Sequence, residues 1–307
     1  MTLATVNLQG ILARSVAIIS LAGLPLASSM AQSPNAFGIP TEKISNPAAS
    51  VVAAPGSRGQ GWLGQGRSEV IARHGMVATS DPIAAQAGLE VLRNGGNAID
   101  AAVAAAAVLD VTSQNDTGIA GDLFALVWSA QDKKLYGLNS AGWAPAGWTP
   151  EYFKETLGVE RVPGTGVNAA TVPGAISGYD ALLNRFGTMG FKETFARAVQ
   201  VADEGWGQAE RRHQDISSVR EKLRGDADSA ATFLNDGEVP PLYSIIRNPQ
   251  LADALRLIQE QGRDAFYKGP IADAIIAKMR SDGGVMTHAD LAEFESEWIE
   301  PISTNYH

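Results

Sequence analysis

The chain has 307 residues, a formal net charge of −9 and no cysteine. Its acidity argues against nucleic acid as a partner, because phosphates attract basic surfaces. The lack of cysteine excludes disulfides, thiolate metal ligands and a cysteine nucleophile. The four histidines (74, 213, 288 and 307) lie far apart, without the spacing of metal ligands. Composition therefore predicts a globular protein with no bound metal, and it indicates no cofactor.

An uninterrupted apolar run, VAIISLAGLPLA, lies near the N-terminus at residues 16–27, after Arg14. It is too short to cross a bilayer, which takes about 20 apolar residues. Ser29 and Ala31 fit the −3 and −1 positions of a cleavage site. We therefore predict a signal peptide over residues 1–31 and export to the periplasm or beyond, with no membrane attachment after cleavage.

Residues 32–72 are rich in Pro, Gly, Ser and Asn, which predicts an irregular linker or arm. The next segment, IARHGMVATSDP, carries a short strand-like piece and then a helix start. Asp81 is the expected N-cap and Pro82 the expected first helical residue. We expect this helix to end at the glycine pair that follows LRN.

A second helix, NAIDAAVAAAAVLDV, is predicted over residues 97–111 and is rich in alanine. Because its small side chains allow close approach, we expect it to be buried against a sheet. Two strand-like runs at 124–130 and 133–139 predict a β-hairpin. A further strand-like run, 166–172, precedes a helix over 173–187 that opens with proline and closes with glycine.

The remaining sequence is mostly helical in pattern. Apolar residues recur at helical spacing in four segments: 191–205, 248–262, 269–284 and 287–298. Thr287 and Asp290 have the spacing of a capping box at the start of the last one. Because strands come early and helices follow in a block, the order favours an α+β fold over alternating βαβ units.

Two loops are candidates for chemistry. GIAGD, residues 118–122, lacks the lysine or longer glycine signature of a phosphate loop. The residues alone favour a tight turn, in which Asp122 can accept hydrogen bonds from backbone amides. LNSAGWAPA, residues 138–146, surrounds Trp143 with small residues, so this aromatic is either the wall of a ligand pocket or a core plug.

No catalytic nucleophile with its base is visible. No serine lies in a G-x-S-x-G elbow, and RRHQD at 211–215 is typical of a solvated helix face. Asp100, Asp110 and Asp116 are spread along the alanine-rich helix and its exit. Their sequence positions alone establish no acid–base pair.

Five segments, taken in order, resemble the large-subunit region of γ-glutamyltranspeptidases and their relatives. They are GMVATSDPIAAQAGLEVLRNGGNAIDAAVAAAAVLDV, GIAGDLFALVW, LNSAGWAPA, VPGAISGYDALLNRFGT and GRDAFYKGPIADAIIAKMRSDGGVMTHADLAEF. The resemblance starts at about Gly75 and assigns residues 73–307 to the large-subunit part. It implies the αββα sandwich of N-terminal-nucleophile hydrolases, of which this chain would hold only the N-terminal portion, an incomplete domain.

The resemblance also implies a mechanism. Such proteins are proenzymes that cleave themselves, and a threonine at the new N-terminus of the small subunit attacks an amide carbonyl with its own amino group as base. In the family this threonine lies well downstream of the segment that PISTNYH resembles. We therefore expect no catalytic residue here, an inactive chain by itself, and the small subunit of the same precursor as partner. The expected substrate is a small-molecule amide or peptide, whose acyl group passes to water or an amine.

One departure concerns specificity. Glutathione-cleaving members carry an arginine in a motif like F-R-E-x-A-P, which grips the substrate's α-carboxylate. In this sequence Ala141 takes that place, followed by Gly142 and Trp143. We therefore expect a divergent branch, with Ala141, Gly142, Trp143, Gly121 and Asp122 binding a substrate other than glutathione. The alternative is a non-catalytic periplasmic binding or scaffold module.

Overall fold

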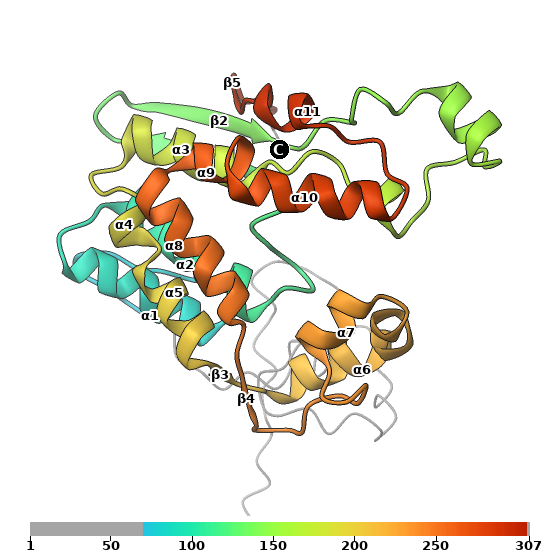
Figure 1. Cartoon of the computed structure of the whole chain (residues 1–307). Coiled ribbons are helices and arrows are strands. Elements are labelled where there is room, and N and C mark those ends of the chain that lie inside the picture. The colour runs from blue at the N-terminus through green and yellow to red at the C-terminus, as the bar shows by residue number, and fades with distance from the viewer. Residues whose placement is uncertain (1–69, 306–307) are drawn as a thin grey trace, which may run out of the picture. The chain divides into compact units, whose positions relative to one another are not determined.

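The computed structural model describes residues 70–305 (Figure 1), so the predicted signal peptide and nearly all of the predicted arm lie outside the described residues. The elements in chain order are α1 (Pro82–Arg93), α2 (Ala98–Thr112), β1 (Leu123–Ser129), β2 (Lys134–Ser140), a π-helical turn (Tyr152–Thr156), a 3-10 turn (Val167–Ala169), α3 (Ala175–Phe186), α4 (Phe191–Thr194), α5 (Ala196–Glu204), β3 (Trp206–Gly207), α6 (Glu210–Arg224), α7 (Ala227–Phe233), β4 (Ile245–Ile246), α8 (Pro249–Gln261), α9 (Arg263–Tyr267), α10 (Pro270–Ser281), α11 (His288–Ala292) and β5 (Glu297–Ile299). The described strands pair antiparallel, as is typical of an α+β fold. The expected order, strands early and helices in a block, is wrong, because β3, β4 and β5 lie among or after the later helices.

The main sheet has three antiparallel strands in the order β1-β2-β5. The predicted hairpin is confirmed, with Leu123 opposite Ser140 at one end and Ser129 opposite Lys134 at the turn. β5 then adds to the other side of β2, with Leu138 opposite Trp298. Within the described part of the chain, β1 and β5 are therefore the edges of this sheet.

The two faces of the sheet differ. Helix α3 packs against β1 and β2 on one face, where a Cβ on Gly178 would touch the side chains of Leu123 and Ser140. The opposite face exposes alternate residues of β1: Phe124 is 71% exposed, Leu126 70% and Trp128 63%. Alternate side chains of a strand point to opposite faces, so these three form one apolar row. An exposed apolar row of this size is unusual for a sheet face that meets water.

The alanine-rich helix α2 is buried, but the expectation that it packs against a sheet is wrong for the described residues. Its main neighbours are the helices α1 and α5. Gly88 of α1 lies so close to α2 that an added Cβ would meet the carbonyl oxygen of Ala101. Small side chains permit close approach by any element, and they do not specify whether a helix or a strand makes it.

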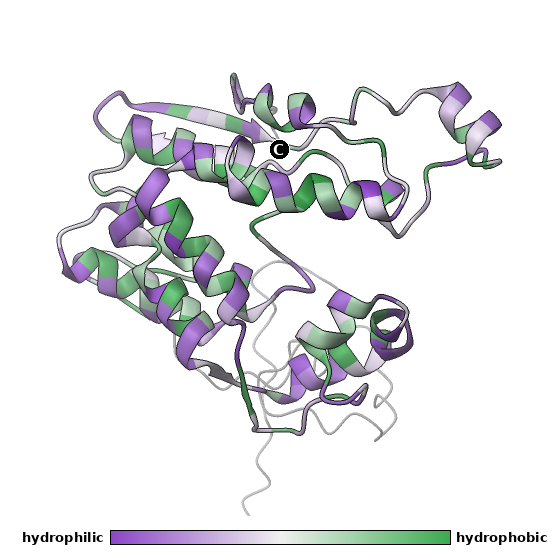
Figure 2. Cartoon of the chain, viewed as in Figure 1, coloured by the Kyte–Doolittle hydropathy of each residue, from purple (hydrophilic) through white to green (hydrophobic). Residues whose placement is uncertain are grey.

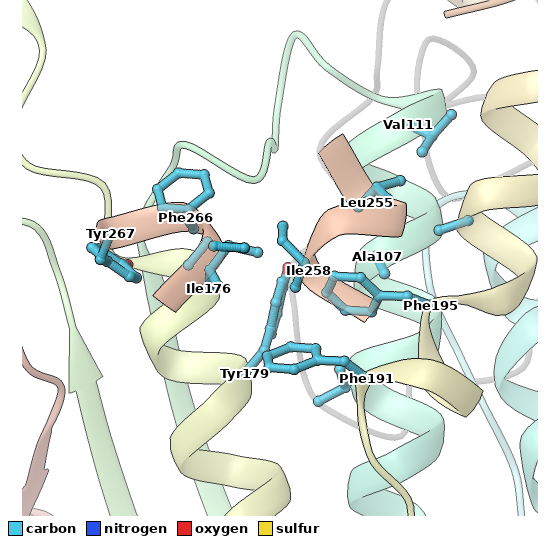
Figure 3. Packing of buried hydrophobic residues seen from close by; sticks show 14 of the residues in the cluster. Ala107, Val111, Ile176, Tyr179, Phe191, Phe195, Leu255, Ile258, Phe266 and Tyr267 are labelled. Carbon is cyan, nitrogen blue, oxygen red and sulfur yellow. The ribbon is translucent and has the colours of Figure 1, made fainter. Parts of the chain in front are cut away.

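The core lies where several helices meet. Figure 3 shows Tyr179, Phe191, Phe195 and Ile258 pointing toward one another, with Phe195 edge-on to both Phe191 and Tyr179. Phe266 and Tyr267 of α9 pack beside Ile176 of α3 in the same view. In Figure 2 green and purple residues mix along α8 and α10, as expected of amphipathic helices that bury one side.

Local signals predicted the helix starts well. Asp81 caps α1 through the amide of Ile83, with Pro82 as the first helical residue. Thr287 and Asp290 form the predicted capping box of α11. Helices were also predicted correctly at α2, α3, α8 and α10.

Other expectations were wrong. The strand-like pieces before α1 and at 166–172 form no strands. The second is a 3-10 turn followed by extended backbone, in which the amide of Val172 donates to the carbonyl of Trp143 in the 138–146 loop. The helix predicted at 191–205 breaks at Phe195, which separates α4 from α5 and whose buried ring packs against Phe191 and Tyr179. The helix predicted at 287–298 ends at Ala292, because residues from Glu297 pair with the free side of β2.

Candidate functional site

The two candidate loops meet in the structure. Gly121 closes a tight turn by donating its amide to the carbonyl of Gly118 at 2.8 Å, as the sequence predicted. The next residue, Asp122, reaches across to the second loop, where its Oδ1 accepts the amide of Gly142 at 2.7 Å. A carboxylate accepting a backbone amide forms a charge-assisted hydrogen bond. The end of the first loop is thereby joined to the middle of the second.

A third segment, just before α3, completes the arrangement. The carbonyl of Gly121 accepts the amides of both Gly174 and Ala175 at 2.8 Å, and the carbonyl of Trp143 accepts the amide of Val172 at 3.0 Å. These contacts are so close that a Cβ on Gly142 would overlap the carbonyl oxygen of Val172. Glycine is therefore required by the packing of backbone on backbone.

The side chain of Trp143 is partly exposed to solvent and packs against one buried aromatic ring. Its side chain is 44% exposed, and its ring lies edge-on against the buried Phe294 with centroids 5.1 Å apart. Of the two roles that the sequence left open, the core plug is thus excluded by exposure. The neighbouring Ala141 is held by its amide, which donates to Oδ1 of Asn139 at 3.1 Å.

The structure therefore brings together the segments that carry all five sequence-predicted site residues. Beside them lies a polar cluster that sequence reasoning missed, because its members come from four separate segments: Ser140, Ser177, Tyr267 and Ser296. Ser140 donates to the carbonyl of Gly174 at 2.7 Å and lies 2.7 Å from the hydroxyl of Ser296, which in turn lies 2.8 Å from that of Ser177. Tyr267 donates to the carbonyl of Pro173 at 2.7 Å and accepts the amide of Ser177 at 3.1 Å. This cluster fixes the backbone before and at the start of α3.

A cavity of about 650 Å³ adjoins the first loop. Gly121 and Asp122 line it, whereas Ala141, Gly142 and Trp143 do not. The remaining lining comes from α2, from the 114–120 segment, from residues 123–125 of β1, and from Tyr179 and Leu182 of α3. The five predicted residues are thus divided between a cavity wall and an adjoining loop surface.

The cavity contains one buried acid, Asp110. Its Oδ2 accepts the hydroxyl hydrogen of Tyr179 at 2.9 Å. Burial raises the pKa of Asp110 to about 7, because desolvation disfavours the charged carboxylate more than Tyr179 and Thr117 stabilise it. A carboxyl group with this pKa can exchange a proton near neutral pH.

The other two aspartates noted on α2 and its exit behave differently. Asp100 accepts the amide of Asn97 and the amides of Thr188 and Met189, so it links α2 to the segment after α3. Burial acts to raise the pKa of Asp100, but the hydroxyl of Thr188, which donates to Oδ2 at 2.6 Å, and these amides together hold it below the usual value. Asp116 is exposed at the cavity rim. The three therefore form no acid–base pair.

Residues 70–305 contain neither a membrane-spanning helix nor a cluster of potential metal ligands. No helix there has the length and apolarity needed to cross a bilayer. No group of three or more His, Asp or Glu side chains is placed to bind a metal ion in that part of the chain.

Comparison with known proteins gives a family. A sequence model of the family "Gamma-glutamyltranspeptidase" matches residues 84–307. The glutathione hydrolase proenzyme of Bacillus subtilis strain 168 is 35% identical over 241 residues, which are 77% of this chain and 40% of that protein. The corresponding proenzyme of Pseudomonas sp. strain A14 is 33% identical and is covered to 42%. The chain thus spans about two fifths of these relatives.

Solved structures agree. The γ-glutamyltranspeptidase of Helicobacter pylori superposes with a TM-score of 0.74 at 29% identity, covering 78% of this chain and 69% of that one. A cephalosporin acylase from Bacillus halodurans gives a TM-score of 0.75 at 38% identity, covering 80% and 47%. The described fold is accordingly a partial α+β domain of the type found in these N-terminal-nucleophile hydrolases. The family match, the relatives and the shared fold together show that this chain belongs to the γ-glutamyltranspeptidase family.

Proposed function

We propose that this chain is the large-subunit part of an exported amide hydrolase or acyltransferase that acts through an acyl-enzyme. The observation that carries the proposal is the joining of the 118–122 and 140–145 loops through Asp122 and Gly142. Their exposed surface carries Trp143 and lies over a rigid polar cluster. A rigid backbone surface of this kind is suited to hold a substrate in a fixed orientation.

The nucleophile in this proposal is a threonine that heads the small subunit of the same precursor and follows the segment described here. The two relatives compared above are named proenzymes, which supports processing. By itself the chain is then inactive. No described residue of the site pairs a nucleophile with a base.

The small subunit is proposed to cover the exposed sheet face. Phe124, Leu126 and Trp128 form the apolar row there, and β1 offers the unpaired backbone groups of an edge strand. Such edges readily accept another strand. Burial of three large apolar side chains would contribute about 1.5–3 kcal/mol each toward holding the two subunits together after cleavage.

Substrate choice is proposed to follow from Trp143. The stretch from Leu138 to Ala146 holds no cationic side chain. The nearby Arg263 is already engaged, through Nε with the Ser177 hydroxyl at 3.4 Å and through a second nitrogen with the carbonyl of Phe294. Neither the 138–146 loop nor Arg263 therefore offers a free cationic group to a substrate carboxylate, whereas Trp143 offers apolar surface. We therefore propose amides without a free α-carboxylate, with Ala141, Gly142, Trp143, Gly121 and Asp122 in contact with the substrate.

The site of action is proposed to be the periplasm or the exterior, after removal of residues 1–31. The apolar run and the small residues at the cleavage site support this.

The test is the intact mass of the full-length gene product purified from the periplasm or the medium, followed by an amide panel. We expect two chains, the lighter one beginning with threonine and the heavier one beginning after Ala31. Acyl anilides with neutral side chains should be cleaved faster than γ-glutamyl anilide. A single unprocessed chain without amidase activity would exclude the proposal.

The alternative, a non-catalytic binding or scaffold module, is disfavoured by the exposed apolar row, which a free-standing module would leave in water. A thermal melt of residues 32–307 by circular dichroism separates the two. We expect a broad, aggregating transition. A sharp, reversible transition would support the module instead.

A further inference from the structure

Residues 206–247 form a small lobe inserted between α5 and α8. The pairing of β3 with β4, Trp206 opposite Ile246, closes its base, and its helices α6 and α7 pack mainly on each other. Figure 1 shows this lobe set apart from the helices α1–α5. The residue just before the lobe is Gly205, whose φ of +101° favours glycine. Trp206 and Ile246 at its base pack with the main hydrophobic core, whereas no residue of α6 or α7 belongs to that core. The position of these two helices is therefore expected to depend on a few specific contacts.

One such contact joins α6 to the segment that follows α2. Arg212 donates one guanidinium nitrogen to Oδ1 of Asn115 and another to Oε1 of Gln114, the latter at 3.2 Å. Asn115 in turn donates its amide nitrogen to Oδ2 of Asp215 at 3.2 Å. Arg212 and Asp215 are three residues apart and therefore lie on the same side of α6. The amide of Asn115 is thus held through both its oxygen and its nitrogen.

The segment held in this way is the rim of the cavity. Residues 114–117 all line it. The rim is a short turn, in which the amides of Asp116 and Thr117 both donate to the carbonyl of Ser113, at 2.8 and 3.0 Å. It leads directly into the 118–122 loop. We therefore expect a displacement of the rim to move the first candidate loop as well.

The contact is more than an exposed ion pair. Arg212 is half-buried, and desolvation lowers its pKa although the carboxylates of Asp215 and Asp116 act in the opposite direction. A partly desolvated guanidinium that donates to two amide oxygens gains directional, charge-assisted hydrogen bonds. Arg220, by contrast, pairs with Glu221 and Glu238 of its own lobe and does not reach the rim.

We propose that Arg212 and Asp215 are positioning residues, through which the α6–α7 lobe holds the 113–117 rim and so sets the shape of the cavity mouth and the placement of the 118–122 loop. The RRHQD segment, expected to be only a solvated helix face, thereby carries a structural role toward the site. The catalytic consequence rests on the proposed function, whereas the effect on the rim does not.

The test uses the full-length protein and hydrogen–deuterium exchange of the peptide that covers residues 113–122. For Arg212→Ala we expect exchange about tenfold faster there, equivalent to loss of ~1.4 kcal/mol of local protection. Arg212→Lys should give an intermediate rate because lysine keeps one charged donor. The matched control Arg220→Ala should leave this peptide unchanged.

Kinetics provide a second readout. If the rim shapes the entrance only, Arg212→Ala should raise KM for the best amide about fivefold and leave kcat within about twofold. Rim exchange equal to that of the wild type, or faster exchange spread equally over α1–α3, would overturn the proposal. A full-length protein that cleaves no amide would refute the proposed function alone, since the exchange rates still decide the role of Arg212.

Discussion

Asp122 and Gly142 are 20 residues apart in sequence, yet the carboxylate of one accepts the backbone amide of the other at 2.7 Å. This hydrogen bond joins the turn before β1 to the loop after β2, so the hairpin brings its two ends together as one surface. Because Asp122 is exposed, the bond contributes more to the placement of the loops than to the stability of the fold.

Asp122→Ala should therefore change activity more than stability. We expect a loss of about 1 kcal/mol or less in the free energy of unfolding, and roughly a tenfold or greater fall in kcat/KM of the full-length enzyme. Asp122→Asn keeps an acceptor oxygen and should retain most activity. Asp253→Ala, at an exposed ion pair on α8, is the control for stability. Equal activity of Asp122→Ala and wild type would remove this contact from the site.

The backbone packing at Gly142 predicts a different effect. A Cβ there overlaps the carbonyl oxygen of Val172, so Gly142→Ala forces the backbone apart and should destabilise the protein by about 3 kcal/mol or prevent folding. Gly118, in the first loop, has open space where a Cβ would lie, with no atom within 4 Å, so Gly118→Ala is the matched control. Denaturant unfolding of both variants makes the comparison. Comparable midpoints would contradict the close packing.

The hydroxyl of Tyr267 is a further testable element. It serves two backbone groups that would otherwise be buried without a partner, the carbonyl of Pro173 and the amide of Ser177. Tyr267→Phe should cost about 1–3 kcal/mol of unfolding free energy. Tyr243→Phe, at an exposed tyrosine, should change it by less than about 0.5 kcal/mol. Thermal unfolding of the two variants measures this difference, and a neutral Tyr267→Phe would show that water replaces the hydroxyl.

The raised pKa of Asp110 predicts how the stability of the folded protein depends on pH. Its pKa is raised to about 7 in the folded protein from the ordinary aspartate value of 3.8. The folded state therefore binds the proton more tightly, and this contribution to stability is complete below pH 4 and is lost as the pH rises toward and past 7. Asp110→Asn keeps an acceptor for Tyr179 without the charge. Relative to wild type it should gain stability as the pH rises from 4 to 8, by about 1.4 kcal/mol per pH unit at most.

Chemical denaturation at several pH values provides the measurement, with the exposed Asp116→Asn as control. A wild type and an Asp110→Asn variant that differ by a constant amount from pH 4 to 8 would show that Asp110 titrates normally.

The exposed apolar row on β1 predicts how a charged substitution there changes the stability of the full-length protein. If the small subunit covers this face, Leu126→Asp should destabilise the full-length protein by more than about 2 kcal/mol. Val219→Asp, at an exposed apolar residue of α6, should be nearly neutral. Should the two variants unfold at the same temperature, the β1 face is a solvent face in the full-length protein.

Sequence by itself determined the elements whose signals are local. Asp81 and Pro82 fixed the start of α1, and Thr287 with Asp290 fixed the start of α11, because capping depends on residues within one turn. The hairpin followed from two strand-like runs and the short polar segment between them. The motifs that resemble the family also gave the fold class, because a shared fold carries its motifs in order.

Only the tertiary structure decided what those elements contact. The alanine-rich α2 lies against α1 and α5, since small side chains admit either kind of neighbour. The helix expected at 287–298 ends early and residues 297–299 form β5, because the free side of β2 supplies hydrogen bonds that no local pattern reveals. The contacts Asp122–Gly142, Asp110–Tyr179 and Arg212–Asn115 likewise join residues at least 20 positions apart. Their geometry depends on the packing of the whole domain, whereas a residue pattern records only near neighbours along the chain.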